Sequence, residues 1–126
     1  MPFIRKFEDV MGWQAARKLV CQVYQLTRTG ALSKDFGMRD QLQRASVPVM
    51  SNIAEGFDCQ SQVEFARFLV IARRSAVEVQ SLLYAAQDVG YIDETIFNQI
   101  YHQASTTKAL IKALKHSLKT PPRTSS

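Results

Sequence analysis

Four long segments of this chain repeat apolar residues at the three- and four-residue spacing of an amphipathic helix, and short turn-rich breaks separate them. The segments run over about 8–29, 37–55, 61–88 and 93–118. No segment sustains the two-residue alternation that is typical of a β-strand. Four helices joined by short loops predict an all-α fold, namely an antiparallel up-down-up-down four-helix bundle.

The apolar stripe of each segment marks the side that we expect to face the core. The third segment carries the most residues in one sector of the helical wheel, and its stripe also contains two phenylalanines. Expected core positions are Val10, Trp13, Ala16, Val20, Val23 and Thr27 in the first segment; Met38, Leu42, Ala45, Val49 and Ile53 in the second; Phe65, Phe68, Leu69, Ala72, Ala76, Val79, Leu83 and Ala86 in the third; and Ile96, Ile100, Ala104, Thr107, Ile111, Leu114 and Leu118 in the fourth.

Turn and capping residues set the expected helix ends. Gly30 and Gly56 are expected to end the first two helices, because glycine readily adopts the left-handed conformation found after a helix. Ser61 and Glu64 fit a capping box at the start of the third helix. The sequence KTPPRTSS stops the fourth helix, and residues 119–126 are predicted to form a disordered basic tail.

Length and composition place the chain among ordinary globular proteins. Its 126 residues suffice for one core, so we expect a single domain over 1–118. No run of about 18 apolar residues is present, and no apolar stretch after the N-terminal charges resembles a secretion signal. The expectation is a cytoplasmic protein without membrane contact.

Metal, cofactor and catalytic signals are weak. Cys21 and Cys59 lack the CxxC spacing of a zinc site, and His102 and His116 would lie about 21 Å apart along one helix. No glycine-rich phosphate loop, HExxH motif or GxSxG motif is present. We therefore expect no metal, no cofactor and no enzymatic activity.

The third segment has a second apolar line. Val63, Val70, Val77 and Tyr84 recur every seven residues, about 120° from the core stripe, and the polar residues Arg73 and Gln80 lie between the two lines. A neighbouring helix of the same bundle could cover this line. The heptad spacing also resembles a seam between subunits, and we favour self-association.

The second segment contains a proline and an asparagine where neither is expected. Pro48 removes the amide that would bond the carbonyl of Arg44, at a usual cost of about 3 kcal/mol. Asn52 lies on the core line, where a buried amide often fixes register or subunit number. Both residues are therefore candidates for the oligomer interface, although Asn52 could instead bond backbone that Pro48 leaves free.

Positive charge gathers toward the C-terminal end. From Lys108 onward the chain has five basic residues and no acidic residue, whereas the preceding 107 residues have 11 of each. A stripe of lysines on one helix face suits phosphate groups, although a merely solvated face would look the same. Candidate nucleic-acid-binding residues are Lys108, Lys112, Lys115 and Lys119, with Arg67 and Arg74 as a second pair on the third helix.

Three stretches carry a family resemblance. FEDVMGWQAARKL, QLQRASVPVMSNIAEGF and VEFARFLVIARRSAVEVQSLLYAAQDVGYI resemble the four-helix-bundle proteins encoded by intervening sequences of bacterial 23S rRNA genes. SNIAEG (51–56), followed by the glutamate and phenylalanines of 64–69, is the most specific part. The resemblance covers about 7–118 and implies homopentameric rings. A more distant relative is the accessory protein of diversity-generating retroelements, which implies association with nucleic acid.

Some positions depart from the family pattern, and they bear on function. Relatives usually carry their proline two positions later than Pro48, and Cys59 stands where they often have an arginine. The expected function is a non-catalytic, RNA-binding oligomer. The alternative is an adaptor that scaffolds an RNA-processing or reverse-transcribing enzyme, for which the second apolar line would be the docking surface.

Overall fold

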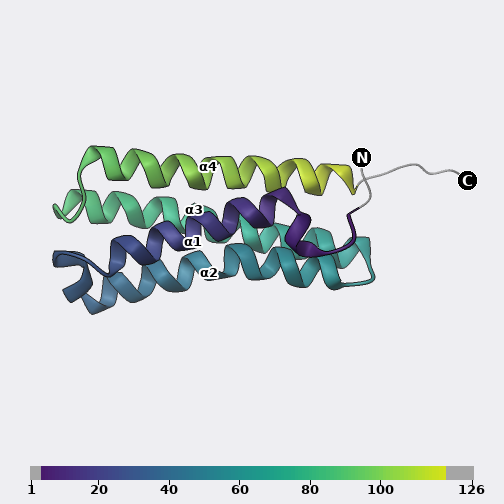
Figure 1. Ribbon diagram of the computed structural model, residues 1–126, viewed down its shortest axis with the longest axis horizontal. Helices are drawn as coiled ribbons and strands as arrows, with labels where there is room; N and C mark the ends of the chain where they lie inside the picture. The colour runs from purple at the N-terminus through teal and green to yellow at the C-terminus, as the bar shows by residue number, and fades with distance from the viewer. Residues whose placement is uncertain (1–3, 119–126) are drawn as a thin grey trace, which may run out of the picture.

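The computed structural model describes residues 4–118 and contains four long helices (Figure 1). They are α1 (Met11–Thr27), α2 (Phe36–Asp58), α3 (Gln62–Asp88) and α4 (Glu94–Ser117). Two short 3-10 helices, Phe7–Asp9 and Ala31–Lys34, precede α1 and α2, and the described part of the chain contains no strand. The fold is therefore all-α, as predicted, and the expected tail at 119–126 lies outside the described residues.

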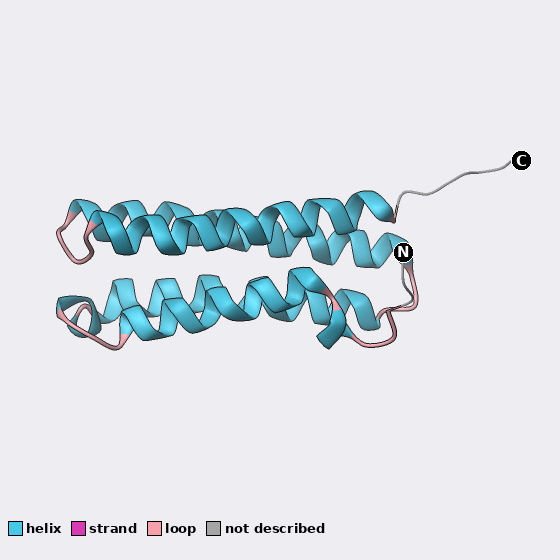
Figure 2. Ribbon diagram, turned by 45° about the horizontal axis from the view of Figure 1, so that its top comes forward, coloured by secondary structure: helices cyan, strands magenta, loops and turns pink. Residues whose placement is uncertain are grey.

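The helices form two layers, with α1 and α2 in one and α3 and α4 in the other (Figure 2). Within the bundle, α1 packs against α2 and α4, and α3 packs against α2 and α4. The α1–α2 and α3–α4 connections lie at one end of the molecule, and the α2–α3 connection lies at the other (Figure 1). The outer groove between α1 and α2 and the outer groove between α3 and α4 consequently lie on opposite faces.

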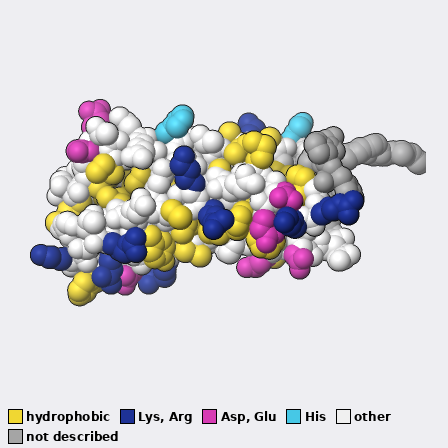
Figure 3. Space-filling view, viewed as in Figure 1, with side chains coloured by type: hydrophobic (Ala, Val, Ile, Leu, Met, Phe, Trp, Pro, Cys, Tyr) yellow, Lys and Arg dark blue, Asp and Glu magenta, His cyan; other side chains and the backbone are white. Residues whose placement is uncertain are grey.

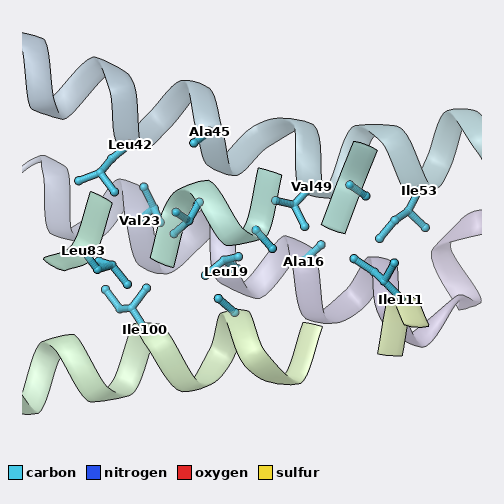
Figure 4. Close-up of a cluster of buried hydrophobic side chains, with 14 of the residues drawn as sticks. Ala16, Leu19, Val23, Leu42, Ala45, Val49, Ile53, Leu83, Ile100 and Ile111 are labelled. Carbon is cyan, nitrogen blue, oxygen red and sulfur yellow. The ribbon is translucent and has the colours of Figure 1, made fainter. Parts of the chain in front are cut away.

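The core consists mainly of aliphatic side chains from all four helices (Figure 4), together with Trp13, Phe65 and Phe97. Most of the expected core positions are buried. Met38, Phe68, Leu114 and Leu118 are only half-buried, and in α1 and α4 a residue adjacent to an expected one is buried instead. Leu19 is fully buried whereas Val20 is half-buried, and Phe97 is buried where Ile96 was expected. In both cases the larger side chain of the adjacent pair fills the interior, which removes more apolar surface from water.

Side-chain caps hold the starts of three helices. Asp35, Ser61 and Asp93 precede α2, α3 and α4, and each accepts a hydrogen bond from the backbone N–H three residues further on, at 3.1, 3.2 and 2.9 Å. These bonds satisfy amides that have no partner within the helix. The predicted cap at Ser61 is confirmed.

Neither glycine marks a helix end in the way that was predicted. Gly30 does have a left-handed backbone, with φ of +62°, but α1 already ends at Thr27. Gly56 lies inside α2, which continues to Asp58, and Gly56 is buried. A methyl group on Gly56 would come within 2.7 Å of Phe68 Cβ, so this glycine allows α2 and α3 to approach closely.

Glutamine side chains tie neighbouring helices together inside the apolar core. Gln43 of α2 donates from Nε2 to the buried hydroxyl of Thr27 at 2.9 Å. Gln103 of α4 donates to the carbonyl of Ala15 in α1 at 3.0 Å. Because partly buried amides need partners of fixed geometry, these bonds select one register between the helices.

Helix α2 continues without a break through Pro48. The side-chain amide of Asn52 donates to the carbonyl of Pro48 at 2.8 Å and is half-buried. That carbonyl is not the one that lost its amide, which belongs to Arg44. The side-chain amide of Asn52 therefore finds its acceptor within its own helix, at a carbonyl different from the one expected.

No helix within residues 4–118 is long and apolar enough to cross a membrane.

Candidate nucleic-acid interface

A cleft of about 410 Å³ opens between α3 and α4. Its walls carry four cationic side chains, two from each helix, and its floor is apolar. The two lysines are three residues apart, so they project from the same side of α4. The lining residues are Leu69, Val70, Arg73 and Arg74 of α3 and Ile111, Lys112 and Lys115 of α4.

The four cations of this groove are not neutralised. None of Arg73, Arg74, Lys112 and Lys115 forms an ion pair or a side-chain hydrogen bond with another residue of the described range 4–118. Like charges that share one groove repel each other and create a positive potential there. We call the cleft that carries these four side chains the cation groove. An anion bound in the cation groove would relieve the repulsion between them.

Lys108 extends the positive charge toward the middle of the molecule. Its ammonium is half-buried and donates to Oε1 of Gln80 at 2.9 Å. Gln80 is only 5% exposed and in turn donates to Ser105 Oγ at 2.9 Å and to the carbonyl of Tyr101 at 3.3 Å. Lys108 is thus held in place by an amide, with no carboxylate to cancel its charge.

Arg73 lines the groove although the sequence analysis did not select it, whereas the selected residue Arg67 lies outside the groove. Arg67 is exposed and pairs with Glu64 at 3.6 Å, and it does not line the groove. Arg73 was treated as a polar spacer between two apolar lines, although it faces the lysines of α4 across the groove. One feature of the sequence could have identified Arg73. It lies seven residues before Gln80, and residues seven apart lie on nearly the same side of a helix, which for Gln80 is the side that contacts α4. Lys119 lies outside the described residues.

The second apolar line of α3 is not buried within the bundle. Val63 is 71% exposed and Val77 is 40% exposed, whereas Val70 is half-buried. Val70 lines the cation groove, and Val63 lines a neighbouring cleft that also contains Lys115. The apolar line and the lysine stripe, which the sequence presented as separate features, therefore lie side by side.

Tyr84, the last member of that line, has a different environment. Its ring is 50% exposed and packs edge-on against Phe97 at 4.8 Å and Tyr101 at 5.8 Å between ring centroids. Phe97 and Tyr101 stack on each other at 5.3 Å. The repulsion that Tyr101 would exert on a tyrosinate, together with partial burial, raises the pKa of Tyr84, so its phenol stays neutral at physiological pH.

Pro48 lies in a different cleft from Val63 and Val70. Pro48 borders a shallow cleft of about 340 Å³ between α1 and α2, on the opposite face of the bundle. The exposed side chain of Val47 lies in the same cleft. Of the residues predicted for the oligomer interface, Pro48 and Val63 therefore line clefts on opposite faces of the bundle.

The face shown in Figure 3 carries a mixed surface. Over α1, basic and acidic side chains are mixed with small apolar groups, and the histidines lie apart along the α4 edge (Figure 3). Within residues 4–118 no three His, Cys, Asp or Glu side chains are placed to hold a metal ion. Cys21 and Cys59 are free thiols.

Comparison with known proteins identifies the family. The model of the 23S rRNA-intervening sequence protein family matches residues 8–113. The chain belongs to this family. The matched range includes Arg73, Arg74 and Lys112 and ends just before Lys115, so most of the cation groove lies within the family domain. No curated protein matches the chain.

A solved structure supports the fold. The crystal structure of a protein of unknown function from the S23 ribosomal protein family of Bacteroides thetaiotaomicron, at 1.70 Å resolution, superposes with a TM-score of 0.77. The alignment covers 85% of this chain and 100% of that chain, at 20% sequence identity. At this identity the likeness establishes the helical bundle that the two proteins share, and nothing about ligands.

Proposed function

We propose that this protein is a non-catalytic RNA-binding protein that uses the groove between α3 and α4. The observation that carries the proposal is the set of four unpaired cations in the cation groove. Phosphate groups would neutralise them and release counterions, which favours binding at low salt. Membership of the 23S rRNA-intervening sequence protein family makes RNA the natural candidate among polyanions.

The proposed contacts are largely independent of base sequence. Lysine and arginine side chains on a helix surface reach phosphates more readily than base edges. The apolar floor formed by Leu69, Val70 and Ile111 would seat sugar or base surface without hydrogen bonds. Affinity from four or five such contacts is modest for one chain.

Assembly would raise that affinity, and it forms the second part of the proposal. We take the chain as an antiparallel up-down-up-down bundle that forms a homo-oligomeric ring, with five copies implied by the family resemblance. The exposed valines of α3 and the Pro48 cleft lie on opposite faces. A head-to-tail ring uses two different faces of each subunit. Repetition of the cation groove around a ring would multiply a weak contact into useful avidity.

Charge reversal in the groove tests the RNA part. The double substitution Arg73→Glu/Lys112→Glu is expected to lower affinity for a labelled RNA at least about tenfold, and to flatten the dependence of log affinity on log salt. Lys18→Glu/Arg28→Glu changes the net charge equally at exposed positions in or next to α1 and is the matched control. Equal losses for the two variants, or binding that salt does not weaken, would refute the groove as the site.

A protein adaptor is the second candidate, because the valine line of α3 is exposed. In that case a protein partner would co-purify after nuclease treatment, and Val63→Ser/Val77→Ser would release it. Association that nuclease abolishes supports RNA binding instead. Solution mass measured with and without nuclease, at low and at high salt, separates a ring, a single chain and an RNA complex.

A further inference from the structure

We propose that Tyr84, which packs on Phe97 and Tyr101, is a stacking platform for a base of single-stranded RNA, about 16 Å along α3 from Arg73 of the cation groove. This inference rests on the proposed RNA-binding function and names the form of RNA and the residue that would contact its base. Three aromatic rings in mutual contact, one of them half-exposed, form the platform.

The helical repeat explains why Tyr84 differs from the valines that precede it. A straight α-helix drifts by about 20° per heptad relative to a seven-residue repeat. Over the three heptads from Val63 to Tyr84 the direction therefore turns by about 60°. At its start the line points away from the bundle, where Val63 is 71% exposed, and at its end it turns toward α4, where Tyr84 contacts two aromatic rings. Tyr84 thus lies on the side of α3 that faces α4.

The aromatic rings, Lys108 and the cation groove follow one another along the side of α3 that faces α4, and we call this line the track. Gln80, which holds the ammonium of Lys108, is one helical turn from Tyr84, about 6 Å along α3. Arg73 lies seven residues further, about 10 Å beyond Gln80, opposite Lys112. A base stacked on Tyr84 would place its backbone next to Lys108, and the following phosphates would reach the cation groove. The track suits a few nucleotides.

Acidic residues lie beyond Tyr84, at the end of the molecule away from the cation groove. Asp88 is one turn past Tyr84 on α3, and Asp93 and Glu94 begin α4 at the same end of the molecule. These carboxylates disfavour phosphates there, so a bound strand would extend from Tyr84 toward Arg73 and not the other way.

The arrangement favours a single strand over a duplex. Bases of a duplex already stack on each other, whereas an unpaired base exposes a face that an aromatic side chain can cover. Aromatic stacking beside a basic groove is the general solution of proteins that bind single strands without sequence preference. The neutral, partly fixed ring of Tyr84 loses little freedom when a base covers it.

The test measures binding of a short, unstructured, fluorescently labelled RNA by anisotropy. Tyr84→Ala is expected to lower affinity about five- to 100-fold, because stacking on one aromatic ring contributes that much to binding. Tyr84→Phe should retain the affinity, and Tyr84→Leu should not. Phe36→Ala is the matched control, because Phe36 is an aromatic residue of α2 that is 64% exposed. Wild type should bind the single strand more tightly than a duplex of the same length.

Each outcome points to one conclusion. If wild type does not bind RNA, the proposed function fails as a whole. If wild type binds but Tyr84→Ala binds equally well, or Tyr84→Leu matches Tyr84→Phe, the platform is wrong and the groove stands. If Tyr84→Ala lowers the solution mass of the RNA-free protein, Tyr84 is a subunit contact, which also overturns the platform. Circular dichroism of each variant verifies that the bundle is folded.

Discussion

The phenol of Tyr91, in the connection between α3 and α4, donates a 2.8 Å hydrogen bond to Oδ2 of Asp35, the residue that caps α2. The two residues are 56 positions apart. Asp35 accepts a second hydrogen bond on Oδ1 from the backbone of Met38. One carboxylate therefore both starts α2 and fastens the two layers of the bundle at this end.

This pair makes stability depend on pH at the acidic side. The hydrogen bonds from the Met38 amide and the Tyr91 phenol lower the pKa of Asp35 below its usual 3.8. Asp35 has a lower pKa in the folded protein than in the unfolded chain. Its contribution to the stability of the fold is therefore fully present above the unfolded pKa and is lost as pH falls through the folded pKa. The melting temperature of wild type should therefore fall more steeply below about pH 4 than that of Tyr91→Phe. Tyr24→Phe should behave as wild type.

The same bond predicts a loss at the alkaline side. The hydrogen bond to Asp35 raises the pKa of Tyr91 above 10.0, since the neutral phenol is the donor. Its stabilisation is present below the unfolded pKa and is lost as pH rises through the folded one. Thermal melts between pH 9 and 11 should show an alkaline decrease that Tyr91→Phe reduces. An identical decrease in both proteins would show that other groups cause it.

The buried contact between Gln80 and Lys108 predicts strong coupling. Gln80→Leu removes the partner of the Lys108 ammonium and of Ser105 Oγ, and it should lower the free energy of unfolding by about 1–2 kcal/mol. Lys108→Met alone leaves the Gln80 carbonyl without its donor. The double variant should lose less than the sum, because two apolar side chains can then pack together. Urea unfolding of wild type, the two single variants and the double variant measures the coupling energy. If the two single losses add up to the loss of the double variant, the predicted coupling is wrong.

The sequence predicted the fold better than it predicted the site. Apolar spacing identified the helices, because burial of one stripe dominates helix stability in a bundle. Which residues line a groove depends on how the two neighbouring helices are rotated about their own axes relative to each other. The helical wheel of one segment gives no information on that rotation. Gln80 therefore read as a spacer, although it is 5% exposed and bonded to α4. The drift that separates Tyr84 from Val63 likewise became meaningful only once α4 lay beside α3.

Gly56 should tolerate no side chain. A methyl group there would lie 2.7 Å from Phe68 Cβ and 2.8 Å from the ring of Phe65, and Phe68 Cβ cannot move without its backbone. Gly56→Ala should lower the free energy of unfolding by about 1–3 kcal/mol, despite the higher helix propensity of alanine. Gly37→Ala is the control, because the nearest atom to its new methyl would be 3.7 Å away. Denaturant melts compare them, and equal stability for both variants would contradict the close α2–α3 approach.

Pro48 offers a substitution that separates folding from assembly. Pro48→Ala supplies the amide that the carbonyl of Arg44 lacks, so the subunit should gain about 1–2 kcal/mol in free energy of unfolding. The gain is below the full helix penalty of proline because alanine also loosens the unfolded chain. Pro48 lines the α1–α2 cleft that the proposed ring would use. Pro48→Ala should therefore melt higher as a single chain yet shift the assembly equilibrium toward smaller particles.

Val47→Ala completes that experiment, because it trims the same cleft without changing the backbone of α2. Melts at low protein concentration give the stability of the subunit, and sedimentation at several concentrations gives the assembled fraction. If the cleft is a subunit contact, both variants lower the assembled mass and only Pro48→Ala raises the melting temperature, because only that variant adds a helix hydrogen bond. Unchanged mass in both variants would show that the α1–α2 face is not a subunit contact. The proposed ring would then be contradicted, because head-to-tail closure requires a second surface opposite the valines of α3.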